Sequence, residues 1–130
     1  MFNSSQSIIQ LAAISGATAV TLGAFGAHYL KNKLRPEDLA IFETGVKYQM
    51  YHTFALIACG ILIKKDSGNR IKNTEHIPTA AKLFATGIAM FSFSLYGLAL
   101  SKRKYKLILG PITPLGGLSL ILGWVVLFYS

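Results

Sequence analysis

At 130 residues the chain is long enough for one domain, yet 52% of its residues are hydrophobic, only 14% are charged and its mean hydropathy is positive. This composition excludes an ordinary soluble domain, which needs polar residues to cover its surface, and indicates a membrane protein. The net charge of +8 does not indicate a nucleic acid partner, because the basic residues lie in loops between apolar segments and not along a stripe with stacking aromatics. We expect this charge to face anionic lipid headgroups instead.

The first apolar stretch runs from Ile8 to Leu30 without a formal charge. Its 23 residues form a helix of about 34 Å, against a hydrocarbon core of about 30 Å. A signal peptide would begin with a positively charged region, but the residues before this stretch, MFNSSQS, contain no Lys or Arg. We therefore expect this stretch to be retained as the first transmembrane span.

The loop KNKLRPEDLA follows, and the second span is predicted at about 42–63. Pro36 suits the first turn of a new helix, and Glu37 and Asp38 are placed favourably near its positive end. The single cysteine, Cys59, lies in this span, so no intrachain disulfide can form.

The polar segment KKDSGNRIKNTEHIPT has the composition of an exposed, mobile loop. The third span is predicted at about 80–100 and, after the basic run SKRKYK, the fourth at about 107–129. In the fourth, Thr113 and Pro114 resemble a helix start, with Thr113 as N-cap. A helix that began there would be slightly short for a span, so we favour a helix that continues through a kink over extended backbone entering the membrane.

Four spans place the first and third loops on one side and both termini on the other. Seven Lys and Arg flank the spans on the first side and five on the second, and the third loop packs four of them into five residues. The positive-inside rule then puts both termini outside the cytoplasm. The predicted fold is an all-α integral membrane protein, one domain over residues 1–130, forming a four-transmembrane-helix antiparallel bundle in the bacterial inner membrane.

Small residues at spacings of three and four give the first and fourth spans faces for close helix packing. The predicted packing residues are Gly16, Gly23, Gly26, Gly116 and Gly123. A compact bundle is the main interpretation of these faces, and a homo-oligomer interface is the alternative.

The stretch FETGVKYQMYH brings charged and aromatic residues to the start of the second span. Glu43 and Lys47 are four residues apart with the acid first, the favoured order for an intrahelical ion pair. Antiparallel threading puts them in the same layer as the end of the first span, the end of the third and the start of the fourth. We therefore predict one polar cluster in the cytoplasmic half, with Glu43 and Lys47 as its ionic centre. Its candidate members are His28, Glu43, Lys47, Tyr48, Gln49, His52, Tyr96 and Thr113.

Other interpretations of these residues stay open. Tyr48 and Tyr51 also suit an interfacial aromatic belt, and His52 suits a neutral histidine that hydrogen-bonds across helices. Haem ligation by His28 and His52 is a sharper alternative, which their different depths disfavour. We expect no cofactor, no metal site and no catalytic residue, because no C-x-x-C or H-x-x-x-H spacing and no nucleophile in a recognisable context occurs.

Four motifs carry a family resemblance over nearly the whole chain. In order they are GAFGAH (Gly23–His28), FETGVKYQMYH (Phe42–His52), SLY (Ser94–Tyr96) and ITPLGG (Ile112–Gly117). They resemble the motifs of the small membrane proteins catalogued as domain of unknown function 423. The resemblance implies four transmembrane helices and no established activity. The chain departs from the pattern in two places. It has Lys47 where Arg is usual, which suggests that this position needs a positive charge more than the bidentate hydrogen bonding of a guanidinium group. Its second loop is also longer and more polar.

Two non-enzymatic functions fit these patterns. In the first, the polar residues form a binding or permeation site inside the bundle for an ion, a proton or a small polar molecule. In the second, they lock the helices of a structural or accessory subunit that recruits a protein partner or anionic lipid. Whether the polar cluster is open or closed to ligands separates the two.

Overall fold

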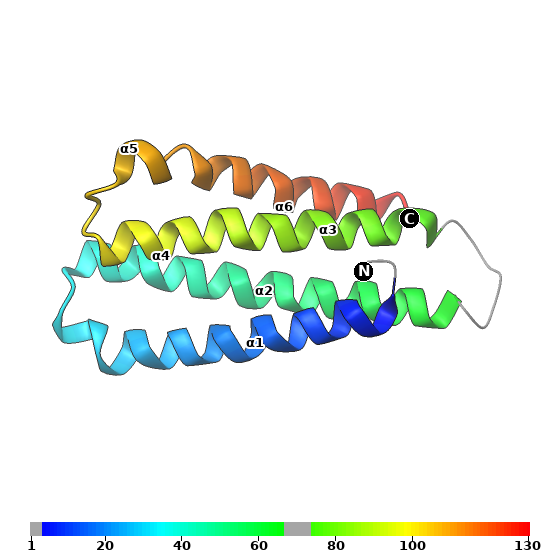
Figure 1. Cartoon of the computed structure of the whole chain (residues 1–130), viewed down its shortest axis with the longest axis horizontal. Helices are drawn as coiled ribbons and strands as arrows, with labels where there is room; N and C mark the ends of the chain where they lie inside the picture. The colour runs from blue at the N-terminus through cyan, green and yellow to red at the C-terminus, as the bar shows by residue number, and fades with distance from the viewer. Residues whose placement is uncertain (1–3, 67–73) are drawn as a thin grey trace.

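The computed structural model describes residues 4–66 and 74–130, and every element in these ranges is helical (Figure 1). Residues 67–73, the centre of the predicted mobile loop, lie outside the described residues. The elements are α1 (Ser5–His28), the 3-10 turn η1 (Leu30–Asn32), α2 (Pro36–Asp66), the 3-10 turn η2 (Thr74–His76), α3 (Ile77–Gly87), the π-helix η3 (Ile88–Ser92), α4 (Phe93–Leu100), α5 (Lys106–Leu109) and α6 (Ile112–Phe128).

Four of the described helical stretches are long and apolar enough to cross a membrane. They are Ser5–Asn32, Pro36–Lys64, Ile77–Leu100 and Lys106–Phe128, because α3, η3 and α4 continue one another, as do α5 and α6. The chain runs up and down through them, so the two termini lie at one end of the bundle and the first and third loops at the other (Figure 1). The predicted all-α, four-span architecture is confirmed.

The second span is one unbroken helix that begins well before its apolar part. Pro36 occupies the first turn, where its missing N–H costs nothing, and Glu37 and Asp38 follow it there. The amphipathic turns before Phe42 therefore continue directly into the apolar ones. α2 is consequently the longest described helix, with 31 residues.

The four helices do not contribute equally to the interior. α2 and the α3–η3–α4 helix lie at the centre, with α1 packed mainly on α2 and α6 packed mainly on α3 and η3 (Figure 1). Few residues of α1 and α6 are buried, whereas the two central helices bury a much larger share. In a bilayer the exposed apolar side chains face lipid, so the outer helices have the larger lipid-facing surfaces.

A π-helical segment in the third span was not predicted. Ser92, at its end, is fully buried and donates a 2.7 Å hydrogen bond to the Gly45 backbone carbonyl of α2. On the other side of the segment, Gly116 of α6 packs against the backbone of Met90 and Phe91. The π-helical turn thus lies where backbone from both α2 and α6 approaches the third span closely.

The fourth span is kinked where Gly110 and Pro111 join α5 to α6, and both residues keep right-handed helical backbone angles. The predicted kink is confirmed, because no extended segment enters the bundle here. Thr113 is not the N-cap, since α6 already begins at Ile112. Its hydroxyl instead lies 2.6 Å from the hydroxyl of Ser94 in α4. The kink therefore lets a polar side chain bond to a neighbouring helix.

The five predicted packing glycines all face a neighbouring helix, but not equally closely. A Cβ atom at Gly16 or Gly23 would lie 3.4 Å from a side-chain methyl of α2, and one at Gly26 would lie 3.0 Å from Phe42. A Cβ atom at Gly123 would lie 2.7 Å from the ring of Phe84, and one at Gly116 would overlap the backbone nitrogen of Phe91. Among these five glycines, those of α6 make the tightest approach to a neighbouring helix.

We expect Gly116→Ala to lower the free energy of unfolding by about 1–3 kcal/mol, because backbone atoms cannot move aside as a flexible side chain can. Gly117→Ala is the matched control: it lies next along α6, and its added Cβ would meet Phe91 ring atoms at an ordinary 3.5 Å. Thermal unfolding of both variants in detergent measures the difference. Equal stability of the two would contradict the close helix approach.

Candidate intramembrane binding site

Gln49 lies at the centre of a buried hydrogen-bonded network near the middle of α2. Its side-chain oxygen accepts a 2.6 Å hydrogen bond from the Tyr96 hydroxyl of α4, and its Nε2 donates a 2.9 Å bond to the Ser15 backbone carbonyl of α1. Only 1% of Gln49 is exposed, so protein groups must replace its bonds to water. One amide thus joins three helices.

Two hydroxyl groups extend the network beside Gln49. Thr53 Oγ1 donates a 2.7 Å bond to the Gln49 backbone carbonyl and lies 2.7 Å from Ser15 Oγ. A hydroxyl has one proton, and Thr53 uses its own on the carbonyl, so Ser15 is the donor between them. The hydroxyl hydrogen bonds therefore all donate in one direction, from Ser15 of α1 to Thr53 and from Thr53 to the Gln49 carbonyl of α2.

His52 lies one turn from Tyr48 on α2, inside a group of aromatic rings. Its Nδ1 is 2.7 Å from the Tyr48 backbone carbonyl, and its Nε2 is 3.1 Å from the indole nitrogen of Trp124 in α6. An indole nitrogen can only donate, so Nε2 accepts and Nδ1 carries the proton. This neutral histidine bonds two helices together, with the ring of Phe84 5.8 Å away between centroids.

The predicted ionic centre is wrong. The side chains of Glu43 and Lys47 are exposed, and within the described ranges no ion pair joins them. His28, the last residue of α1, is exposed as well. Antiparallel threading predicts that these residues lie at similar depths, but depth does not decide which way a side chain points around its helix. Gln49 turns toward the bundle, whereas Lys47, two residues earlier, points about 200° away.

The candidate cluster is therefore divided between several places. Gln49 and Tyr96 meet, and Tyr48 contributes its backbone carbonyl to His52. The Tyr48 side chain is exposed, and its ring centroid lies 4.8 Å from that of Phe91 and 5.9 Å from that of Tyr51. Thr113 bonds to Ser94, apart from the Gln49 network.

Asp38 is the buried charge that the sequence did not reveal. Its side chain is fully buried, and its Oδ2 accepts a 2.9 Å hydrogen bond from Arg35 Nε. Its Oδ1 lies 3.2 Å from Arg103 Nε in an ion pair, although that pair lacks the alignment of a hydrogen bond. Arg35, three residues before Asp38, was a visible partner, but Arg103 comes from the third loop. Its approach depends on how the two helical hairpins pack.

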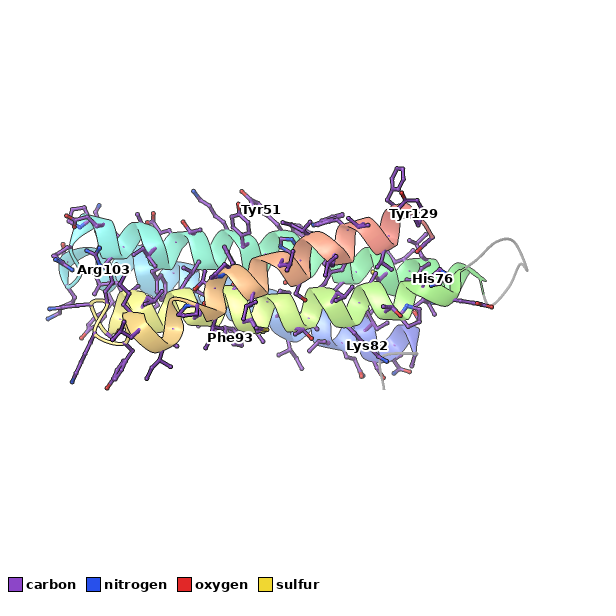
Figure 2. All side chains as sticks on the ribbon, turned by 90° about the horizontal axis from the view of Figure 1, so that it is seen from above. Tyr51, His76, Lys82, Phe93, Arg103 and Tyr129 are labelled. Atoms are coloured by element: carbon purple, nitrogen blue, oxygen red, sulfur yellow. The ribbon has the colours of Figure 1, made fainter. Side chains whose placement is uncertain are left out.

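The backbone of the third loop is unusual where it presents Arg103. Lys102 and Arg103 have φ values of 53° and 65°, a region that residues with side chains seldom occupy. Such strain persists only where surrounding contacts hold it. The ion pair with Asp38 is one such contact, and it ties the third loop to the start of α2 at the loop end of the bundle (Figure 2).

The two histidines of the haem alternative have different surroundings. Both ring nitrogens of His52 are engaged, and His28 lies exposed at the end of another helix. In residues 4–66 and 74–130, no group of three or more His, Cys, Asp or Glu side chains is arranged to hold a metal ion.

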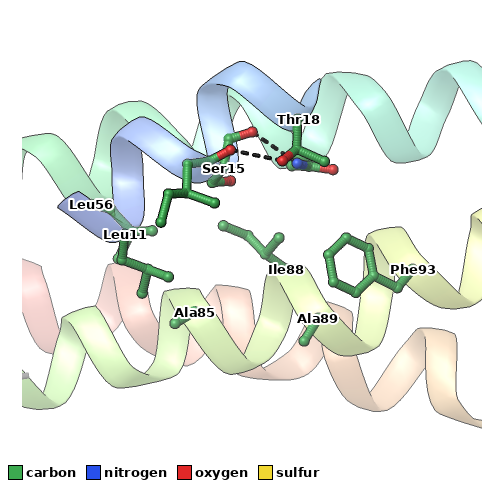
Figure 3. A pocket seen from close by; sticks show the side chains of 10 residues that line it. Leu11, Ser15, Thr18, Leu56, Ala85, Ile88, Ala89 and Phe93 are labelled. Atoms are coloured by element: carbon green, nitrogen blue, oxygen red, sulfur yellow. Dashed lines mark hydrogen bonds between the residues drawn. The ribbon is translucent and has the colours of Figure 1, made fainter. Parts of the chain in front are cut away.

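A cavity of about 200 Å³ adjoins the Gln49 network, between α1 on one side and α3, η3 and α4 on the other (Figure 3). Three polar residues line it, namely Ser15, Thr18 and Gln49. The other lining residues are apolar: Leu11, Ile14, Leu56, Ala85, Ile88, Ala89 and Phe93. α1 has few contacts with the third span, so the cavity lies in a seam between them.

The cavity lies near the middle of the helices that form it. Ser15 is ten residues from Ser5 and thirteen from His28, and Ile88 is eleven residues from Ile77 and twelve from Leu100. Membrane transport and binding proteins often hold their ligands at this depth. The sequence did not predict this cavity, because it results from small side chains at Ala85 and Ala89 opposite α1.

We expect Asp38→Asn to cost about 1.5–3 kcal/mol of stability, the range for hydrogen bonds to charged groups. The loss should stay below that for a fully buried pair, because Arg35 and Arg103 are roughly half exposed and can turn to water. Glu37→Gln is the matched control, since Glu37 is an exposed carboxylate in the same helical turn. Thermal unfolding in detergent measures the stability of both variants. Equal losses of stability would show that Asp38 contributes only through its charge near the helix N-terminus and not through the two arginines.

Gln49→Leu should destabilise the bundle by about 1–3 kcal/mol, because the buried Tyr96 hydroxyl loses its acceptor. Adding Tyr96→Phe should recover part of that loss, with a coupling of about 0.6–1.7 kcal/mol, as found for hydrogen bonds between membrane helices. Reversible unfolding of the two single variants and the double variant gives the coupling. Strictly additive losses would mean that the 2.6 Å contact contributes nothing.

The sequence comparisons agree with this architecture. The family described as "Protein of unknown function (DUF423)" matches residues 22–117. The chain is 42% identical over 119 residues to the UPF0382 membrane protein YwdK of Bacillus subtilis, over 92% of this chain and 90% of that protein. It is 43% identical to a UPF0382 membrane protein of Staphylococcus saprophyticus (92% and 91% covered) and 34% identical to one of Haemophilus influenzae (94% and 90% covered).

No solved structure matches this one. The relatives are membrane proteins of bacteria, and the described helices cross a membrane four times, so the chain is a multi-pass bacterial membrane protein. The matched region contains all four motifs that carried the resemblance. The chain belongs to the DUF423 family of membrane proteins.

Proposed function

We propose that the protein is a non-enzymatic membrane protein that binds a small, mainly apolar molecule taken from the bilayer. The observation that carries the proposal is the cavity at mid-depth, where Ser15, Thr18 and Gln49 interrupt an otherwise apolar wall. Ligand sites in proteins generally combine apolar walls with a few polar groups that orient the ligand.

The size of the cavity limits what it can hold. A dry cavity of about 150 Å³ holds benzene, whereas sites for drug-sized molecules measure about 300–1,000 Å³. At about 200 Å³ the cavity therefore suits one small apolar molecule or the end of a hydrocarbon chain. Such a ligand need not cross the headgroup layer, because the seam between α1 and the third span faces lipid.

The chemistry of the lining supports binding over catalysis or ion permeation. None of its ten residues is ionisable. The amide of Gln49 and the hydroxyl of Ser15 are engaged within the protein, and Thr18 donates to the Ile14 carbonyl at 2.8 Å. These groups retain free lone pairs on oxygen, so they can accept a hydrogen bond from a ligand hydroxyl, but they offer no acid, base or nucleophile.

The accessory alternative has one observation of its own. At the loop end of the bundle, Arg35 and Arg103 share the single carboxylate of Asp38 and are both partly exposed, and Lys102 and Lys104 flank them. This excess positive charge suits anionic lipid headgroups, each exposed cation adding about 1 kcal/mol near a charged membrane surface. The positive-inside rule favours a cytoplasmic location for this end.

Ala85→Phe should abolish ligand binding, because its ring would fill the cavity. The purified protein is extracted with organic solvent, and the apolar molecules that were bound are identified by mass spectrometry. Thr86→Phe is the matched control, since Thr86 is the next residue of α3, is exposed and does not line the cavity. We expect a bound species in the wild type and in Thr86→Phe that Ala85→Phe lacks. The same molecules at the same level in all three proteins would overturn the proposal.

A further inference from the structure

One face of α2 is uncovered from Ala40 to Ile61, although α2 is a central helix. Its exposed residues follow one another at spacings of three and four: Ala40, Glu43, Lys47, Tyr51, Phe54, Ala58 and Ile61. Such spacing places them in a continuous ridge on one side of the helix. Tyr51, in the middle of this ridge, points away from the bundle (Figure 2). We call this set of residues the α2 ridge.

The α2 ridge contains two opposite charges one helical turn apart. Lys47 follows Val46, whose side chain faces Gly23. Gly23 is five residues before the end of α1, so Lys47 lies roughly 7 Å inside the bundle end. Exposed charges at such a depth are costly in lipid unless they pair with another group. In the described part of the chain neither Glu43 nor Lys47 has an ion-pair partner, so the structure leaves both to be matched by something outside it.

We propose that the α2 ridge is the interface of a homodimer. A second copy in the same membrane orientation, related by a two-fold axis along the membrane normal, places its Lys47 beside Glu43 and its Glu43 beside Lys47. A two-fold interface uses the same patch twice, so the patch must complement itself. The ridge meets this condition because it carries one acid and one base in adjacent turns, and both pairs form at once.

The remaining ridge residues fit the same occupant. Ala40 and Ala58 permit close approach of two helices, whereas Tyr51 and Phe54 between them supply large rings to pack across the axis. An anionic lipid would match Lys47 but would repel Glu43. A second copy satisfies both charges, which makes it the occupant that the ridge favours.

The dimer leaves the cavity accessible, so this inference does not depend on the proposed ligand. Gln49 and Leu56, the residues of α2 that line the cavity, point about 200° and about 180° away from Lys47 around the helix. The cavity and the α2 ridge therefore lie on opposite sides of α2. Ligand exchange with lipid and dimerisation can proceed independently.

Charge exchange between two copies tests the interface. Two differently tagged full-length chains are co-expressed, solubilised in mild detergent, captured through one tag and detected through the other. Wild type should capture wild type. Glu43→Lys with itself and Lys47→Glu with itself should each lose capture by roughly tenfold or more, because like charges then oppose each other twice. Co-expression of Glu43→Lys with Lys47→Glu should restore capture, since both cross-interface pairs are again opposite.

The mixed pair separates an interface from pairing within one helix. Within a single copy, Glu43→Lys and Lys47→Glu each place like charges four residues apart, and mixing them changes nothing. Recovery in the mixture alone therefore requires contact between copies. Lys64→Glu, an exposed charge at the far end of α2 and about 100° around the helix from Lys47, should capture itself like wild type. Failure of wild type to capture itself, full capture by either single variant, or no recovery in the mixture would each overturn the proposal.

A cross-link provides a measurement that does not depend on the charge variants folding. Phe54→Cys on the α2 ridge should form a disulfide-linked dimer on mild oxidation in native membranes, whereas Leu118→Cys, a comparably exposed position on α6, should not. The native Cys59 is fully buried and does not compete. Equal cross-linking of the two variants, or none by Phe54→Cys, would place the interface elsewhere or exclude it.

Discussion

The side-chain amide of Gln49 is the interaction on which the rest of the bundle depends. In lipid no hydrophobic force drives one helix against another, so a four-helix protein is held by close packing and by hydrogen bonds between helices. Gln49 is the residue through which α1, α2 and α4 are joined by direct side-chain bonds. A single bond of this kind averages only about 0.6 kcal/mol in a membrane protein. Its larger effect is on register, because any shift of one helix would strand a buried amide without partners.

The close helix contacts follow from the same constraint. Gly116 lets α6 approach the backbone of the π-helical segment, and Gly45 lets the ring of Tyr96 lie against α2 beneath its bond to Gln49. A side chain at Gly45 would meet that ring at 2.7 Å. The glycine and the glutamine, four residues apart on α2, thus act together: one provides the space for Tyr96 and the other binds its hydroxyl. Packing and hydrogen bonding specify the same helix arrangement.

The sequence predicted the features that depend on depth and missed those that depend on direction. The uncharged run from Ile8 to Leu30 and the basic third loop were enough for the spans and for their antiparallel order. Depth also brought Gln49 and Tyr96 into one layer, where they bond. The rotation of α2 about its axis was not visible, because polar residues occur all around its first turns, and so Glu43 and Lys47 were placed inside. Arg103 and Asp38 are 65 residues apart, and no local pattern connects them.

Asp38, Glu43 and Lys47 show what decides where a charge lies in such a protein. Asp38 is fully buried because two arginines reach it, one from the residue just before α2 and one from a strained loop. Glu43 and Lys47 lie further along the helix, beyond the reach of the basic loops. The free-energy penalty for burying either charge without a partner would exceed the free energy gained by packing its side chain. On the α2 ridge both charges face lipid, where an unpaired charge is also costly, and a partner of matching charge order can pair with them. Where the fold supplies a counter-charge, the charged residue is buried. Where it does not, the charged residue stays on the outside of the bundle and forms part of a surface for association.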